Sequence, residues 1–296
     1  MTRFTSSFGL DPQIEKELRK MGPHFDQDVL ERSRALFSDR KDHSLPEGGW
    51  KEENIPYGDH ARQILDLCIP GGTKNPIVLF VPGGGFTGGD KSFYAHIPYF
   101  FARKGYLGVA MNYRLAPEFV WPAGGQDVSG ALDWLAANAQ RYGGNPAQIF
   151  LIGQSAGAVH SATALFDRRF RPDAYDSIRA AVLMSGLYLI AVENCAPTIG
   201  VYFGDDPSVY PDRSSARFVD DSAVPVLLTL NELEPPFFAH STAALLEALA
   251  VRDGSAPPLA WLRGHNHLSA VLGLGGPGDE LGEALHAEFQ KYGVKS

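Results

Sequence analysis

Cysteine is scarce in this chain of 296 residues, which contains only Cys68 and Cys195. Two cysteines are too few for a disulfide framework, and neither has the spacing of a metal-binding motif. The opening residues MTRFTSSF lack the apolar core of a signal peptide, and no apolar run approaches membrane-spanning length. We therefore expect a protein of the reducing cytoplasm that does not act in a membrane.

Positively charged residues are also fewer than negatively charged ones. The chain has 26 Lys and Arg residues and 34 Asp and Glu residues, which gives a net charge of -8. This balance argues against nucleic acid or an anionic membrane surface as a partner. Hydrophobic residues make up 44% of the chain and charged residues 20%, which is typical of a globular protein with ample core. No internal repeat or low-complexity tract is present, and the length suits one large α/β domain.

Residues from about Asp11 to Arg40 predict two amphipathic helices. Asp11 and Pro12 suit an N-cap followed by a first-turn proline, and Pro23 ends the first helix. We assign residues 1–53 to an N-terminal helical segment. Its apolar faces must cover something, and we favour a lid over the functional site to simple packing at an edge.

From residue 54 to 296, short apolar runs alternate with helical stretches, which predicts one catalytic domain of the α/β class. Strands are expected at residues 62–69, 76–81, 107–112, 149–153, 180–185, 224–230 and 259–262. Helices are expected at residues 94–104 and 126–142, directly after residue 155, and at residues 236–250 and 279–292. The alternation implies a mostly parallel sheet with helices on both faces. Residues 186–221 interrupt it, and we expect this insertion to form a cap together with the N-terminal helices.

The pentapeptide G-Q-S-A-G at residues 153–157 follows an apolar run of strand length. It has the G-x-S-x-G pattern of a nucleophile elbow, in which a sharp strand-to-helix turn exposes the hydroxyl of a serine, here Ser155. The alternative is a glycine-rich turn that carries an ordinary surface serine, so other parts of the chain must decide.

A nucleophilic serine requires a base and a carboxylate, which follow it in the order acid then histidine in this type of fold. Glu232 and Glu234 follow the predicted strand at 224–230, and we favour Glu234 as the acid. His265 and His267 follow the last strand, and we favour His267 as the base because an apolar segment comes directly after it. Metal binding by the two histidines is a weaker alternative, because no further ligand stands nearby.

Three glycines at residues 83–85 follow the predicted strand at 76–81. Such a loop lets backbone N–H groups approach a ligand, and with the N–H of Ala156 it could stabilise an oxyanion. A phosphate-binding loop is disfavoured, because the chain has neither a Gly-Lys-Ser/Thr ending nor a dinucleotide motif there.

Aromatic side chains are frequent in the loops beyond the strand ends, where they could line an apolar substrate pocket. The main candidates for substrate binding are Phe86, Trp121, Tyr188 and Phe237. Further candidates are Phe119, Tyr202, Phe203 and Phe238.

In combination these stretches resemble the hormone-sensitive-lipase-like carboxylesterase group of α/β-hydrolases, and they are also similar to arylformamidase-type relatives. The match is carried by residues 82–86, 112–118, 121–123 with Asp127, 153–157, 232–236 and 264–267. The resemblance implies an α/β-hydrolase fold with the following site: nucleophile Ser155, acid Glu234, base His267, and oxyanion donors Gly84, Gly85 and Ala156.

Two departures from the group stand out. Pro82 occupies the place of a histidine that usually precedes the glycines, and the acid is a glutamate where aspartate is common. We read residues 113–117 and Asp127 as scaffold for the loop after their strand.

The predicted function is hydrolysis of a small to medium carboxylic ester through an acyl-enzyme intermediate, without a metal or organic cofactor. The expected partner is a small-molecule ester, and a homodimer is left open. The alternatives are an arylformamidase or another amide or lactone hydrolase. A ligand-binding module on an inactive hydrolase fold is disfavoured, because both the serine and the histidine are present.

Overall fold

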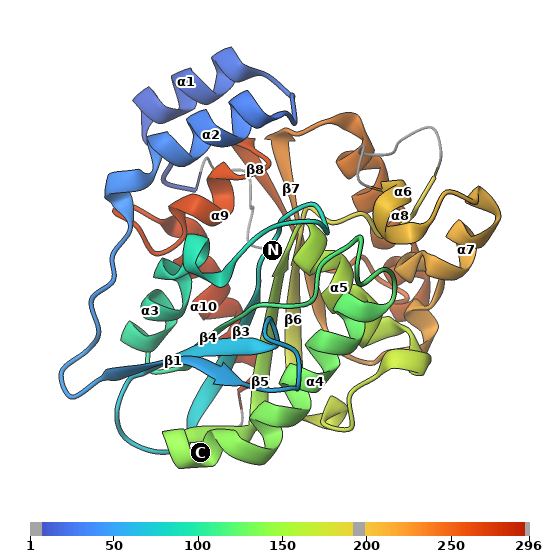
Figure 1. The fold of residues 1–296 in the computed structure, drawn as a ribbon. Coiled ribbons are helices and arrows are strands. Elements are labelled where there is room, and N and C mark those ends of the chain that lie inside the picture. Colours follow the sequence, from blue (N-terminus) through green and yellow to red (C-terminus); the bar gives the residue numbers. More distant parts are fainter. Residues whose placement is uncertain (1–7, 192–198, 294–296) are drawn as a thin grey trace.

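An eight-stranded sheet forms the centre of the molecule, which a computed structural model describes for residues 8–191 and 199–293 (Figure 1). The strand order is β1-β2-β4-β3-β5-β6-β7-β8. The strands are β1 (Trp50–Pro56), β2 (Ile64–Ile69), β3 (Asn75–Val81), β4 (Leu107–Met111), β5 (Gly144–Gln154), β6 (Ile178–Met184), β7 (Val226–Leu233) and β8 (Leu259–Asn266). From β4 to β8 all neighbours are parallel, whereas β1 and β2 join the edge in antiparallel fashion. The expected α/β-hydrolase class with a mostly parallel sheet is confirmed.

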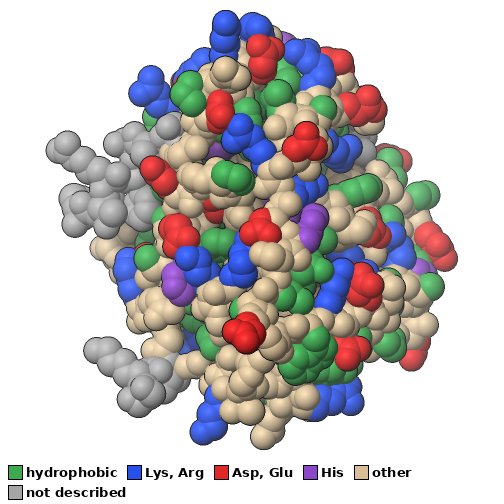
Figure 2. Space-filling view, turned by 90° about the vertical axis from the view of Figure 1, so that its left-hand side faces the viewer, with side chains coloured by type: hydrophobic (Ala, Val, Ile, Leu, Met, Phe, Trp, Pro, Cys, Tyr) green, Lys and Arg blue, Asp and Glu red, His purple; other side chains and the backbone are tan. Residues whose placement is uncertain are grey.

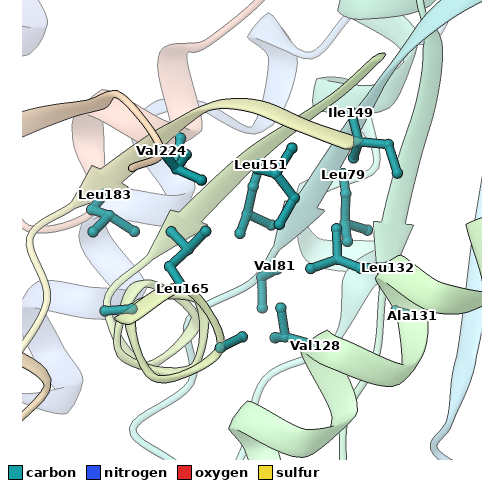
Figure 3. Close-up of a cluster of buried hydrophobic side chains, with 14 of the residues drawn as sticks. Leu79, Val81, Val128, Ala131, Leu132, Ile149, Leu151, Leu165, Leu183 and Val224 are labelled. Carbon is teal, nitrogen blue, oxygen red and sulfur yellow. The ribbon is translucent and has the colours of Figure 1, made fainter. Parts of the chain in front are cut away.

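The central strands are buried on both faces, which explains their continuous apolar sequences. In β3, Leu79 and Val81 face one core, while Val78 and Phe80 face the other. Figure 3 shows Val128 and Leu132 of helix α4 directed toward the strand residues of the first core. This alternation fixes the register of the strands, because a shift by one residue would exchange the two faces.

Helices cover both faces of the sheet. They are α1 (Pro12–Met21), α2 (Gln27–Leu36), α3 (His96–Arg103), α4 (Ala123–Asn138), α5 (Ala156–Phe166), α6 (Ile199–Phe203), α7 (Tyr210–Arg213), α8 (Pro236–Asp253), α9 (Ser269–Gly273) and α10 (Glu280–Tyr292). Helices α4, α5 and α8 bury apolar side chains in the first core, and α1, α3 and α10 do so in the second. No helix within the described residues has the length and apolar character needed to cross a bilayer.

The N-terminal helices α1 and α2 lie side by side beyond the carboxyl ends of the last strands (Figure 1). Asp11 caps α1 with Pro12 in its first turn, as expected, and Asp26 caps α2. Helix α1 packs against β8 and α2 packs against α9. The segment thus covers the end of the sheet at which ligands bind in open α/β folds.

Several elements differ from the expectations. Strand β5 begins at Gly144, five residues earlier than expected. Strand β1 was not expected, because five of its seven residues are exposed and its sequence WKEENIP is polar. Helix α4 begins three residues earlier than expected, at Ala123. Strands β7 and β8 continue farther than expected, so Glu232 and His265 lie inside strands.

The insertion expected at 186–221 contributes α6 and α7, and its residues 192–198, including Cys195, lie outside the described ranges. Cys68 is buried with a free thiol. Acidic and basic side chains are interspersed on the face shown in Figure 2, which gives no extended field of one sign there.

Candidate active site

Ser155 occupies the sharp turn between β5 and α5. Its backbone has φ 54° and ψ -122°, a strained conformation for a residue with a side chain. The flanking glycines are required by close packing: a Cβ atom at Gly153 would lie 2.6 Å from the carbonyl oxygen of Gly157. A Cβ atom at Gly157 would collide with the carbonyl oxygen of Val81. The turn therefore has the geometry of a nucleophile elbow and is no ordinary glycine-rich turn.

A chain of two hydrogen bonds connects Ser155 to His267 and Glu234. His267 Nε2 lies 2.8 Å from Ser155 Oγ, and His267 Nδ1 lies 3.0 Å from Glu234 Oε1. All three side chains are buried. Because an ionised carboxylate only accepts hydrogen bonds, Nδ1 carries the proton of the neutral ring and Nε2 accepts from the serine hydroxyl.

Asn231 holds the carboxylate of Glu234, a role that sequence reasoning missed. Its side-chain amide donates to Glu234 Oε1 at 2.8 Å and to Ser185 Oγ at 3.1 Å. The backbone N–H of Asn231 donates to Glu234 Oε2 at 3.3 Å. Both carboxylate oxygens are thereby fixed, and Oε1 faces the imidazole. The only signal in the sequence was an amide residue at the end of a buried strand.

The alternative acid, Glu232, is engaged elsewhere. It accepts hydrogen bonds from the guanidinium of Arg19 on α1 at 2.9 Å and from the backbone N–H of Gly264 at 2.7 Å. The hydrogen bond from Arg19 lowers the pKa of Glu232 below its usual value. Glu232 therefore joins α1 to the sheet and does not contact His267.

The alternative base, His265, also lies apart from the serine. Its Nδ1 lies 3.0 Å from Ser269 Oγ, in the buried turn after β8. Its neighbour Asn266 accepts from the N–H groups of Leu268 and Ser269 and donates to Ser33 Oγ of α2 at 2.7 Å. These bonds fix the turn that carries His267.

Two phenylalanines hold the imidazole ring of His267. Phe238 at the start of α8 stacks on it, with centroids 4.1 Å apart, and Phe25 contacts it edge-on at 4.7 Å. Phe25 immediately precedes Asp26, the N-cap of α2. The N-terminal helical segment thus contributes a wall of the site, and no local pattern around Phe25 indicated this contact.

The glycine loop after β3 lies beside Ser155. A Cβ atom at Gly83 would meet the side chains of Gln154 and Ser155, so a larger residue there would displace the elbow. Within the described residues, the N–H groups of Gly84, Gly85 and Ala156 donate no hydrogen bond. They are available to an oxygen placed near the serine.

Residues of the expected scaffold, together with two residues before β2, form hydrogen bonds around this loop. The hydroxyl of Tyr113 donates to the carbonyl oxygen of Pro82 at 2.8 Å, and Arg62 donates to the carbonyl oxygen of Gly89 at 2.8 Å. Asp127 accepts from Arg114 and from the side chain of Gln63. Burial raises the pKa of Tyr113, so its hydroxyl stays protonated and able to donate.

Two pockets open from Ser155. The larger has a volume of about 490 Å³ and lies between α2, the glycine loop and His267. The smaller has a volume of about 20 Å³ and is closed by apolar side chains: Phe25, Phe86, Val159, Leu187 and Phe238. The site therefore offers one roomy side and one side with space for only a few atoms.

The structure separates the four expected substrate-binding aromatics. Phe86 lines the small pocket and stacks on Tyr202 at 4.6 Å. Tyr188 is instead fully buried in the first core, where its hydroxyl accepts from the N–H of Gly186. Trp121 packs edge-on against Phe170 at 5.3 Å, and Phe237 packs beside Phe238 at 4.5 Å. Neither Trp121 nor Phe237 lines either of the two pockets.

A buried histidine, His160, lies behind Phe86 on α5. Its ring is 5.6 Å from that of Phe86 and 4.6 Å from that of Tyr113, and its Nδ1 lies 3.3 Å from the hydroxyl of Tyr202. Burial lowers its pKa to about 3, so the ring is neutral at physiological pH. Among the described residues no group of three or more His, Cys, Asp and Glu side chains is arranged to hold a metal ion.

Sheet topology and the strained serine elbow together define an α/β-hydrolase fold. Residues 65–168 match the BD-FAE family model. Esterase LipQ from Mycobacterium tuberculosis is 28% identical over 230 residues, covering 70% of this chain and 54% of that protein. The probable carboxylic ester hydrolase LipM from the same organism is 36% identical over 149 residues, covering 46% of this chain and 34% of that protein. The chain thus spans about a third to a half of the length of these curated relatives.

Solved structures show the same fold along nearly the whole chain. Esterase B from Lactobacillus rhamnosis superposes with a TM-score of 0.75 at 17% identity, covering 95% of both chains. The hyperthermophilic esterase from Pyrobaculum calidifontis gives a TM-score of 0.70 at 20% identity, covering 96% of this chain and 97% of that chain. The expected resemblance to carboxylesterases of the α/β-hydrolase fold is confirmed.

Proposed function

We propose that this protein is a serine hydrolase that cleaves a small to medium carboxylic ester through an acyl-enzyme intermediate. The observation that carries the proposal is the hydrogen-bonded chain from Ser155 through His267 to Glu234, with distances of 2.8 and 3.0 Å. The names of the relatives LipQ and LipM, an esterase and a probable carboxylic ester hydrolase, support the same reaction class.

In the first half of the reaction, Ser155 Oγ attacks the ester carbonyl while His267 Nε2 accepts the hydroxyl proton. Glu234 stabilises the imidazolium that forms, and Asn231 keeps the carboxylate oriented toward Nδ1. The N–H groups of Gly84, Gly85 and Ala156 stabilise the negative oxygen of the tetrahedral intermediate. Collapse of this intermediate transfers the proton from His267 to the leaving alcohol and leaves the acyl group on Ser155.

In the second half, a water molecule takes the place of the alcohol and loses a proton to His267 Nε2. Its oxygen attacks the acyl carbonyl, and the same amides stabilise the second tetrahedral intermediate. The proton then returns to Ser155 Oγ, and the carboxylic acid leaves.

The two departures from the group are compatible with this scheme. The carbonyl oxygen of Pro82 accepts a hydrogen bond from Tyr113, which braces the glycine loop where a histidine usually stands. The longer side chain of Glu234 reaches His267 at hydrogen-bonding distance. We further propose that α1, α2 and the described part of the 186–221 segment act as the cap of the site, since Phe25 and Leu187 form pocket walls.

Replacement of the nucleophile tests the proposal. Ser155→Ala is expected to lose at least about 10³-fold in kcat toward p-nitrophenyl acetate while its circular dichroism stays native. Ser208→Ala, at an exposed serine, is the matched control and keeps wild-type turnover. A fluorophosphonate probe should label the wild-type protein and fail to label Ser155→Ala.

A panel of carboxylic esters, lactones and aryl formamides defines the reaction class. Faster turnover of an aryl formamide than of every ester would replace the ester assignment with the formamidase alternative. Absence of probe labelling on the folded wild-type protein would contradict nucleophilic catalysis by Ser155 altogether.

A further inference from the structure

The two pockets at Ser155 have different tasks in the proposed reaction, on which this inference rests. His267 Nε2 must hand its proton to the departing oxygen, so the leaving alcohol has to lie beside His267. His267 lines the large pocket and does not line the small one. The alcohol part of the substrate therefore belongs in the large pocket, and the acyl part in the small pocket.

Helix α2 supplies the charged side chains of the large pocket, Asp26 and Arg34. Asp26 is already used within the helix, because it caps α2 by accepting from the N–H of Val29 at 3.0 Å. A carboxylate at this position is also stabilised by the positive end of the helix. The carboxylate of Asp26 therefore already has a hydrogen-bond donor within the protein, and Arg34 is the better candidate to bind a ligand.

Arg34 is exposed and, among the described residues, has no carboxylate oxygen within 4.0 Å. Its guanidinium lies 5.4 Å from the centre of the Phe93 ring, and Phe93 is 47% exposed. This leaves an unpaired planar cation next to an accessible aromatic ring at the margin of the leaving-group pocket. Guanidinium groups recognise carboxylate and phosphate through paired hydrogen bonds.

A second cation adds to the positive charge at this margin. Lys41 donates to the backbone carbonyl oxygen of Phe93 at 2.9 Å. The pKa of Lys41 is lowered, first by burial and then by the nearby charge of Arg34. Asp90, directly after Gly89 of the glycine loop, already accepts hydrogen bonds from the N–H of Ser92 and the side chain of Asn112. Within the described part of the chain, the charge that remains without an opposite partner at the edge of the large pocket is thus the positive charge of Arg34.

We propose that the natural substrate carries an anionic group, a carboxylate or a phosphate, on its alcohol part, and that Arg34 binds this group. Arg34 is then a specificity-determining residue, outside the reacting atoms. Phe93 provides an apolar face beside the anion, which suits an alcohol whose anionic group is attached to a carbon skeleton.

Matched pairs of acetate esters test this inference. The carboxylate pair is 4-carboxyphenyl acetate and its neutral amide, 4-carbamoylphenyl acetate; the phosphate pair is acetylglycerol phosphate and monoacetylglycerol. We expect wild-type kcat/KM to favour at least one anionic ester by about tenfold, after correction for the intrinsic hydrolysis rates, because one charge-assisted contact is worth about one to two decades. The two pairs show whether the anion is a carboxylate or a phosphate.

Arg34→Gln should lower the anionic-to-neutral ratio about tenfold, mainly through KM, because the lost contact exists before the transition state. Raising the salt concentration should lower the wild-type ratio in the same direction. Arg32→Gln is the matched control, since Arg32 lies on the same helix, pairs with Asp28 and lies outside both pockets. Its ratio should equal that of the wild type.

The inference and the proposed function fail in different ways. An equal ratio in the wild type and Arg34→Gln for both pairs overturns the inference, while turnover of the neutral esters leaves the proposed function intact. Absence of turnover and of fluorophosphonate labelling in folded wild-type protein overturns the proposed function, and the inference with it.

Discussion

The imidazole of His267 stacks on the ring of Phe238, with centroids 4.1 Å apart and planes inclined by 23°. Phe238 belongs to α8, which begins two residues after Glu234, so the same stretch supplies both the carboxylate and the surface on which the ring rests. The same stretch therefore determines both the plane of the imidazole ring and the hydrogen bond that its Nδ1 donates. Orientation of the imidazole is then a property of residues 231–238.

Phe238→Leu should reduce kcat for acetate esters about tenfold, because a looser imidazole spends less time aligned between Ser155 and Glu234. Stopped-flow or steady-state kinetics would measure this loss. Phe237→Leu is the matched control: its half-buried ring lies outside both pockets, and we expect near wild-type kcat. Equal losses in both variants would show that the effect comes from general disturbance of α8.

The two glutamates at the end of β7 should respond very differently to loss of charge. Glu234→Gln should reduce kcat by about 10³-fold or more, because a neutral amide neither stabilises the imidazolium nor selects the correct tautomer. Glu232→Gln should keep kcat and lose less than about 1 kcal/mol of unfolding free energy, because its partner Arg19 is partly exposed. A dead Glu232→Gln beside an active Glu234→Gln would reverse the assignment of the acid.

The small pocket should limit the length of the acyl chain. Its volume of about 20 Å³ accommodates little more than the methyl group of an acetyl ester. Leu187→Ala should shift the preference from acetyl toward butyryl and hexanoyl esters, measured as kcat/KM across a p-nitrophenyl series. Leu30→Ala removes a wall of the large pocket instead and should leave the acyl profile unchanged. A wild-type preference for long acyl chains would contradict this assignment of the pockets.

Two buried histidines should make the fold less stable in mild acid. Burial lowers the pKa of His96 and of His160 to about 3, whereas each has its ordinary value of about 6.5 in the unfolded chain. Below pH 6.5 the unfolded chain therefore binds protons that the native protein does not. Each histidine then costs up to about 1.4 kcal/mol of unfolding free energy per pH unit as the pH falls toward 4.

Asp279 acts in the opposite direction in this window. Burial raises its pKa to about 6, so the native protein binds a proton between pH 6 and 4 that the unfolded chain does not bind. These three groups together should thus give a slope near pH 5.5 of about 1.4 kcal/mol per pH unit. Urea denaturation at pH 7.5, 6.5 and 5.5 would measure it.

His96→Gln should flatten this pH dependence, because glutamine can still donate to the carbonyl oxygen of Val271 but does not titrate. His24→Gln, at an exposed histidine, is the control and should retain the wild-type slope. An unchanged slope in His96→Gln would mean that the buried ring is not the source of the acid sensitivity.

The parts of the site that could be predicted from the sequence are those encoded by local patterns. Gly153 and Gly157 are needed by the turn itself, and Gly83 by the close approach of the elbow, so both appear as short motifs. The strands of the central sheet could also be predicted, because strands that are buried on both faces have continuous apolar sequences. Strand β1 had no such signal, since it lies at the edge with most of its residues exposed.

The parts that could not be predicted depend on contacts between distant segments. Nothing near Phe25 indicates that it will meet His267, 242 positions later, because the contact exists only once α2 lies across the end of the sheet. Tyr188 was expected in the pocket, yet its ring turns into the core, and only its burial could reveal this. The sequence alone therefore does not distinguish a loop aromatic that lines a pocket from one that packs in the core.

The packing of α1 against β8 has a consequence for the order in which the chain is made. A ribosome synthesises residues 12–36 more than 200 residues before Leu259–Asn266, the strand that α1 covers. Until then Leu18 and Met21, both buried in the finished protein, lack the surface that shelters them. Helix α1 therefore reaches its buried position only after β8 has been made, so this wall of the site is completed by a contact between segments far apart in the sequence.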